Sequence, residues 1–269
     1  MKPKNISQIQ MIAEYDGDIR SLIDTKYDGV LPILATRNVV LFPGVITPIL
    51  IGREQSLNLI NEMNKDPKNV FGLFCQENTD VENPGIDDIY PTGVYAKLVK
   101  IIDMPVANGQ KTAIIQALGR CNLKELKLSK PFLFGKVEAF PEQLPEHTHD
   151  SSDVYNTAIN SLRSHMEEYV SKNDEYPNES LLAIRNIEDD VLLVNFIASN
   201  LPISNDEKIV LLQTETVEER LYSLLNILSR EIQFMDLKLQ IQNKTHQDID
   251  EQQREYFLHQ QMRNIREEL

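Results

Sequence analysis

The chain carries two serine–lysine pairs whose residue types could do chemistry. Ser129-Lys130 and Ser171-Lys172 contain the hydroxyl and the amine of a hydrolytic dyad, in which the amine activates the serine as a nucleophile. Adjacency in the sequence neither creates nor excludes the spatial contact that such a dyad needs. We interpret both pairs as surface residues.

A histidine-containing segment has the residue types of a metal site. His147-Thr-His149-Asp150 offers two imidazoles and a carboxylate, which are ligands that zinc accepts. The segment lies in a linker without a second ligand cluster, so we assign no metal to it. The other histidines, at 165, 246 and 259, occupy polar helical positions and are interpreted as solvated.

The motifs of several large enzyme classes are absent. The only Gly-Lys pair, Gly135-Lys136, is followed by Val137 and therefore lacks the serine or threonine of a phosphate-binding loop. The patterns GxSxG and HExxH do not occur. Cys121 is interpreted as a buried thiol rather than a nucleophile. We therefore predict no catalytic, cofactor-binding or metal-binding residue in this chain.

Composition narrows the compartment and the class of partner. The 269 residues include 41 acidic and 27 basic side chains, for a net charge of −14, which argues against a nucleic-acid-binding protein. Only two cysteines are present, so a disulfide scaffold is excluded and a reducing cytoplasm is expected. No apolar run approaches the roughly 20 residues of a membrane span, and the first residues do not resemble a signal peptide. We expect a cytoplasmic protein that does not bind a membrane.

The first half of the chain has the pattern of a β-rich domain. Short apolar runs, rich in β-branched residues, alternate with Pro and Gly, and one helix is expected at about Glu54–Asn64. The dipeptide Asn108-Gly109 favours a hairpin turn. Such a pattern indicates a small barrel or a pair of packed sheets. The strands are predicted at 31–34, 39–42, 45–51, 70–75, 92–102, 111–118 and 132–139.

The second half is helical throughout. Helices are predicted at 154–170, 181–187, 191–199 and 207–212, and capping boxes begin at Ser204 and Thr216. From Val217 to Leu239 six steps between apolar positions cover 22 residues, a mean of about 3.67, which fits an α-helix rather than a strict heptad coil. The helix then becomes polar before apolar residues return. If continuous, residues 216–269 would extend about 80 Å.

This polar middle excludes burial of the whole helix in one core, so the helix must bridge two bodies, pair with another chain or fray. The chain ends within a helical pattern without a C-cap, and we interpret it as a fragment of a longer protein. The apolar residues near its end form our predicted interaction surface, although packing against a following module is the alternative. This predicted cluster consists of Tyr256, Phe257, Leu258, Met262 and Ile265.

Two segments resemble the amino-terminal part of Lon, the ATP-dependent protease family. The first is Leu31-Pro-Ile-Leu-Ala-Thr-Arg-Asn-Val-Val-Leu-Phe-Pro-Gly44, followed by Pro48-Ile-Leu-Ile-Gly-Arg53. The second is Gln253-Arg-Glu-Tyr-Phe-Leu-His-Gln-Gln-Met262, which resembles the stretch before the family's ATPase module. The likeness covers about residues 30–269. Ala35-Thr36 departs from the family's usual Pro-Leu, and Ala117 from its usual Gly.

The resemblance implies an α+β fold, with a small PUA-like β-rich pseudo-barrel followed by an α-helical bundle and a long C-terminal helix. It implies four regions: a flexible tail at 1–29, the β-rich domain at 30–140, a helical bundle at 141–215 and the long helix at 216–269. The β-rich domain is further expected to bury Val39–Phe42 in its core.

The implied function is recognition of unfolded or damaged protein substrates, together with assembly, in an ATP-dependent serine protease. The resemblance implies that ATP and Mg²⁺ act in a hexameric parent protein beyond this non-catalytic fragment, which we expect to be a monomer or dimer. The alternatives are a stand-alone Lon-like substrate-binding protein and a helical adaptor that uses 216–269 as a coiled coil.

Overall fold

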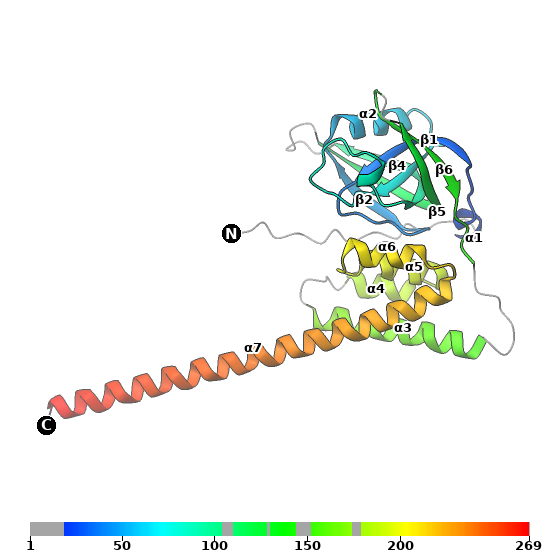
Figure 1. Ribbon diagram of the computed structural model, residues 1–269. Coiled ribbons are helices and arrows are strands. Elements are labelled where there is room, and N and C mark those ends of the chain that lie inside the picture. The colour runs from blue at the N-terminus through cyan, green and yellow to red at the C-terminus, as the bar shows by residue number, and fades with distance from the viewer. Residues whose placement is uncertain (1–18, 104–109, 128–129, 144–151, 174–178, 269) are drawn as a thin grey trace.

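A computed structural model describes residues 19–103, 110–127, 130–143, 152–173 and 179–268. It contains a β-rich body, a group of helices packed against one end of that body, and one long helix that projects away from both (Figure 1). The predicted α+β class, with a β-rich pseudo-barrel followed by helices, is confirmed. The predicted hairpin turn at Asn108-Gly109 and the histidine segment at 147–150 lie outside the described residues.

In the described residues, six strands form one sheet in the order β2-β5-β4-β3-β1-β6, and a further pairing between β5 and β6 closes it into a pseudo-barrel. All pairings are antiparallel except that of β1 with β3. The long strand β5 makes this closure possible, because its first part pairs with β2 and its last part with β6. The strands are β1 (Gly29–Thr36), β2 (Ile46–Ile51), β3 (Val70–Cys75), β4 (Thr92–Asp103), β5 (Lys111–Lys127) and β6 (Leu133–Ala139).

The predicted helix at 54–64 is confirmed as α2 (Glu54–Met63), whose Leu59, Ile60 and Met63 are buried. A short 3₁₀ turn, η1 (Ile86–Asp88), follows β3. The segment 39–42 is not a strand, contrary to the prediction, but a connection between β1 and β2. Its residues from Val40 to Phe42 are nevertheless buried, so the prediction that this segment belongs to the core is confirmed.

The described end of the predicted tail is ordered by packing. Ile19–Ile23 forms the short helix α1, and its Leu22 and Ile23 are buried. The following residues run so close to β5 that a Cβ atom at Gly119 would lie 2.3 Å from the carbonyl oxygen of Thr25. Only glycine allows this approach, and the chain before β1 therefore lies against the barrel.

The helical part consists of α3 (Ser152–Lys172), α4 (Glu179–Asn186), α5 (Asp190–Asn200) and α6 (Asn205–Gln213). All four confirm the helices predicted in this region. Helix α5 is buried at every residue from Val191 to Ser199, because it lies between the barrel, α6 and the other helices. The predicted capping box at Ser204 is present at the start of α6.

The last element, α7 (Val217–Glu268), is one continuous helix of 52 residues. At 1.5 Å per residue it is about 78 Å long. Its first turns pack against α3 and α5, where Leu221, Leu224 and Leu228 are fully buried, and the rest projects from the body (Figure 1). Among the described helices, α7 included, none combines the length and the apolar character that would let it cross a membrane.

Candidate binding surfaces

Three charged side chains form an ionic junction where the barrel meets the helices. Glu142, in the connection after β6, lies between Arg120 of β5 and Arg220 of α7, and all three side chains are at most 1% exposed. Arg220 contacts the Glu142 carboxylate directly, and the Arg120 Nε atom lies 3.9 Å from it. The junction links the barrel to the start of α7, and loss of one partner would leave an uncompensated buried charge.

Each arginine also holds the end of α6. Arg120 donates to the carbonyl oxygens of Leu212 and Thr214, at 2.7 and 2.5 Å, and Arg220 donates to that of Leu211 at 2.9 Å. Cations at a helix C-terminus satisfy carbonyls that have no partner within the helix. Burial lowers the pKa of Arg120 to about 10, although the neighbouring Glu142 carboxylate opposes this shift.

An exposed apolar surface lies on the outer side of the barrel, away from the junction. Leu50 on β2 and Ile102 on β4 pair on either side of Thr112 on β5, so all three side chains share one face of the sheet. Pro48 and Ile114 form the next row of that face, together with the exposed Lys100 on β4, so four of the six positions in the two rows are apolar. Leu50 is 50% and Ile102 43% exposed. We call Pro48, Leu50, Ile102 and Ile114 the sheet patch; the sequence prediction missed it, because alternation in each strand did not reveal which face is covered.

A pocket of about 280 Å³ opens beside the start of α2. Its lining combines apolar residues of β1 and β6, such as Ile33 and Leu133, with Arg53 and the rim residue Glu82. The Arg53 guanidinium is already engaged, since it donates to Gln76 Oε1 at 2.7 Å and to the carbonyl oxygen of Ala35 at 2.5 Å. Arg53 therefore ties α2 to β1 and β3 and does not offer a free cation to a ligand.

The predicted cluster near the end of α7 is exposed at all five positions, with fractions between 52% and 70%. Helical geometry divides it. Leu258, Met262 and Ile265 follow one another at spacings of four and three residues and share one side of the helix. Tyr256 and Phe257 lie on other sides. The predicted surface is therefore accessible, but it is not one contiguous patch.

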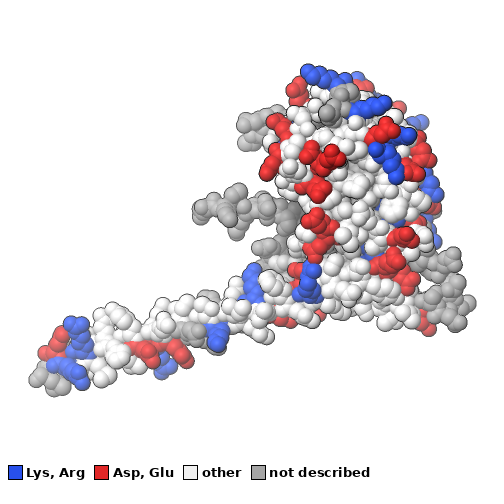
Figure 2. Space-filling view, viewed as in Figure 1, with Lys and Arg blue, Asp and Glu red and all other residues white. Residues whose placement is uncertain are grey.

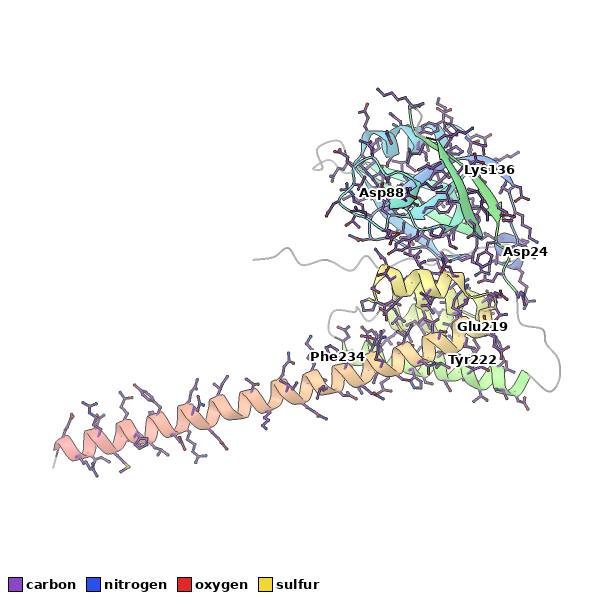
Figure 3. The ribbon with its side chains drawn as sticks, viewed as in Figure 1. Asp24, Asp88, Lys136, Glu219, Tyr222 and Phe234 are labelled. Carbon is purple, nitrogen blue, oxygen red and sulfur yellow. The ribbon has the colours of Figure 1, made fainter. Side chains whose placement is uncertain are left out.

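A second exposed apolar group on α7 was not recognised in the sequence. Phe234, Leu237 and Ile241 are 64%, 53% and 58% exposed and also follow a spacing of three and four. Phe234 stands where α7 leaves the body (Figure 3). Figure 2 shows charged side chains in small groups of both signs along the projecting part, with uncharged surface between them. The sequence prediction treated this segment as a continuation of the buried face.

Both cysteines are buried, and the ammonium group of Lys208 is hydrogen-bonded. Burial raises the pKa of Cys75 to about 11 and raises that of Cys121 further, so both thiols stay protonated near neutral pH. Burial also lowers the pKa of Lys208 to about 8, and its ammonium donates to the Ser199 carbonyl oxygen at 2.6 Å. Within the described residues, no three His, Cys, Asp or Glu side chains come together in a way that could hold a metal ion.

Comparison with known proteins identifies the family to which the chain is similar. Residues 30–230 match the family model described as the ATP-dependent protease La (LON) substrate-binding domain. The chain is 40% identical over 244 residues to a Lon protease of Parabacteroides distasonis and 38% identical over 260 residues to that of Porphyromonas gingivalis. These matches cover 91% and 96% of this chain but only 29% and 30% of the relatives, so the chain spans about three tenths of their length.

A solved structure has the same fold. The N-terminal domain of the Mycobacterium avium complex Lon protease aligns with a TM-score of 0.55 and 21% sequence identity. The alignment covers 74% of this chain and 98% of the other. At this identity the likeness concerns the fold alone.

Proposed function

Because the chain belongs to the Lon protease family, through its substrate-binding domain, we propose that it captures exposed apolar segments of unfolded or damaged proteins for an ATP-dependent protease. In this proposal the chain itself is non-catalytic. The ATPase and serine protease parts, with ATP and Mg²⁺, belong to a longer cytoplasmic parent protein that assembles as a hexamer. The observation that carries the proposal is the sheet patch, an accessible apolar surface on the domain that the family model matches.

The sheet patch has the chemistry needed for such capture. Folded proteins bury most large apolar side chains, so an apolar surface discriminates unfolded segments from folded ones. Each apolar side chain of a client contributes about 1.5–3 kcal/mol when fully buried, so one patch binds weakly. Several copies acting on one client would raise the overall affinity through their high effective concentration. The predicted cluster is proposed as a further contact for the client, and its members are Tyr256, Phe257, Leu258, Met262 and Ile265.

The test is binding of a permanently unfolded protein, such as a reduced and alkylated one, to the chain in the absence of ATP. We expect binding of the unfolded form and at least about tenfold weaker binding of its native form, since the native form presents few apolar segments. Replacing Leu50 and Ile102 by lysine should weaken binding of the unfolded form about tenfold, because two of the four apolar contacts are removed.

Val210→Lys is the matched control, since Val210 is 65% exposed but lies on α6, away from the sheet patch. Equal affinity for native and unfolded forms would refute the proposed function. Selective binding that the Leu50 and Ile102 replacements leave unchanged would instead move the site to another surface of the domain.

A further inference from the structure

A β-bulge in β4 lies at the border of the sheet patch. Leu98 pairs with Ile115, and the next pairing along the strand joins Lys100 to Ile114. Two residues, Val99 and Lys100, therefore stand opposite the single residue Ile114. A bulge of this kind redirects side chains and is frequent beside functional sites. Val99 is 51% exposed and Lys100 is exposed, so the bulge adds an apolar side chain and an ammonium group to this border.

The ammonium group of Lys100 has no counter-charge in the described part of the chain. Its neighbour across the strands is Ile114, which is apolar. Lys124, at the other end of β5, is instead paired with Glu138 of the adjacent strand at 2.9 Å. No ion pair or side-chain hydrogen bond within the described residues engages Lys100. Its charge is therefore available to a partner.

The surrounding face of the sheet has a different charge from the rest of the chain. The whole chain has a net charge of −14, but none of the nine paired positions around the sheet patch is acidic and two are lysines. A partner that touches this face therefore meets cations and no carboxylates from these rows. The three rows are Leu50, Thr112 and Ile102; Pro48, Ile114 and Lys100; and Ile46, Gln116 and Lys97.

The spacing along β4 defines a matching client. Lys100 and Ile102 are two residues apart and lie on the same face, so their Cα atoms are about 6.6 Å apart along the strand. In an extended client, side chains two residues apart also share one side at this distance. We propose that Lys100 makes the sheet patch selective for unfolded segments in which an aspartate or glutamate lies two residues from a large apolar residue. The inference rests on the proposed function, because it names the clients of the same surface.

This preference is distinct from the effect of the overall charge. A net charge of −14 attracts basic segments and repels acidic ones at a distance, so it acts against the proposed preference. A client lysine beside Lys100 would place two like charges together, which disfavours basic segments at the patch itself. A neutral client is still accepted, since the aliphatic stem of a lysine packs on apolar groups while its charged end stays in water.

The test uses unfolded peptides that share one large apolar residue and differ only two positions away, where they carry glutamate, glutamine or lysine. Fluorescence anisotropy with the full chain measures each dissociation constant. The glutamate peptide should bind about three- to fivefold tighter than the glutamine peptide, and the lysine peptide more weakly than both. In about 1 M salt the differences should shrink to less than about 1.5-fold, because salt screens exposed charges. A fourth peptide, with its glutamate moved to the far end, should bind like the glutamine peptide.

Variants of the chain assign the preference to one side chain. Lys100→Met keeps a similar length without the charge and should bring the glutamate, glutamine and lysine peptides within about 1.5-fold of one another. Lys100→Glu should reverse their order. Lys127→Glu is the matched control, because Lys127 is also an exposed strand lysine but lies at the far end of β5. It makes the same change in net charge and should leave the order of the peptides unchanged.

The outcomes separate this inference from the function on which it rests. Equal binding of the glutamate and glutamine peptides to the unchanged chain would refute the selectivity and leave capture of apolar segments intact. A preference that persists in Lys100→Met would also refute it, since another group would then be responsible. Equal binding of the fourth peptide and the first would overturn the spacing. No binding of any peptide would refute the proposed function itself, and the inference with it.

Discussion

The first and the projecting parts of α7 both contain large apolar residues but have opposite surroundings. Both place large apolar residues at helical spacings, yet Leu221, Leu224 and Leu228 are fully buried whereas Phe234 and Leu258 are more than half exposed. Spacing determines which residues share one side of a helix, but only a neighbouring element decides whether that side is covered. The comparison separates what stabilises this domain from what it offers to partners.

The largest expected effect breaks the ionic junction that holds the first part of α7. Glu142→Ala leaves Arg120 and Arg220 buried without their carboxylate, which should lower the free energy of unfolding by about 3–5 kcal/mol. Urea unfolding followed by circular dichroism measures this loss. The control is Glu125→Ala, because the pair of Glu125 with Lys136 is exposed and should contribute less than about 1 kcal/mol. Equal losses for the two replacements would show that the buried junction contributes no more to stability than an exposed ion pair.

The second prediction compares the two parts of α7 directly. Leu228→Ala should lower the free energy of unfolding by about 2–5 kcal/mol, because it creates a cavity at a fully buried position. Leu258→Ala, the same change at a half-exposed position, should lower it by less than about 0.5 kcal/mol in the monomer. Urea unfolding at a low protein concentration, at which the chain is a monomer, measures both losses. A large loss for Leu258→Ala would mean that the projecting part is covered.

The smallest expected effect concerns the ion pair between α6 and α7, near the point where α7 leaves the helical bundle. Arg230 lies 2.8 Å from Glu207, and this hydrogen bond lowers the pKa of the glutamate. The folded state therefore binds its proton less readily than the unfolded state, so the contribution of Glu207 is present above the unfolded pKa and is lost as the pH falls through the lowered one.

Arg230→Ala should therefore reduce the acid sensitivity of the unfolding free energy by less than about 1 kcal/mol, because the pair is largely exposed. Thermal or urea unfolding as a function of pH, from neutral to below the unfolded pKa of Glu207, would measure it. Arg254→Ala, at an exposed position of the projecting part, is the control and should leave the decrease of the unfolding free energy at low pH unchanged. If the unfolding free energy of Arg230→Ala and of the unchanged chain decreased identically at low pH, the proposed contribution of the Arg230–Glu207 pair would be contradicted.

Local patterns predicted most elements, because most are defined by local periodicity. Helix α2, strand β3 and the four bundle helices lie where apolar spacing placed them. Strand β5 extends nine residues beyond the predicted 118, since its last part alternates with charged residues and is held by pairing with β6. Val39–Phe42 was misassigned because a buried connection and a buried strand have the same apolar composition.

The binding surfaces were harder to predict, because they depend on contacts between distant segments. Glu142 meets residues 22 positions before it and 78 positions after it, and no local pattern joins them. Exposure of the predicted cluster is consistent with a role in interaction, but that role stays a prediction. Phe234 and Leu237 are apolar like the residues of the buried face that precede them. Only the structure shows that α3 ends near this point and that these two side chains are exposed.

The continuous α7 also governs how the particle moves in water. A compact chain of this length would have a radius of gyration of about 18 Å, whereas α7 alone is about 78 Å long. Such a shape tumbles anisotropically, with fast spinning about its long axis and slow end-over-end rotation. Its translational friction is likewise larger than that of a sphere of equal mass. The projecting helix thus enlarges the radius within which the domain collides with other molecules. It also slows the end-over-end rotation of the domain.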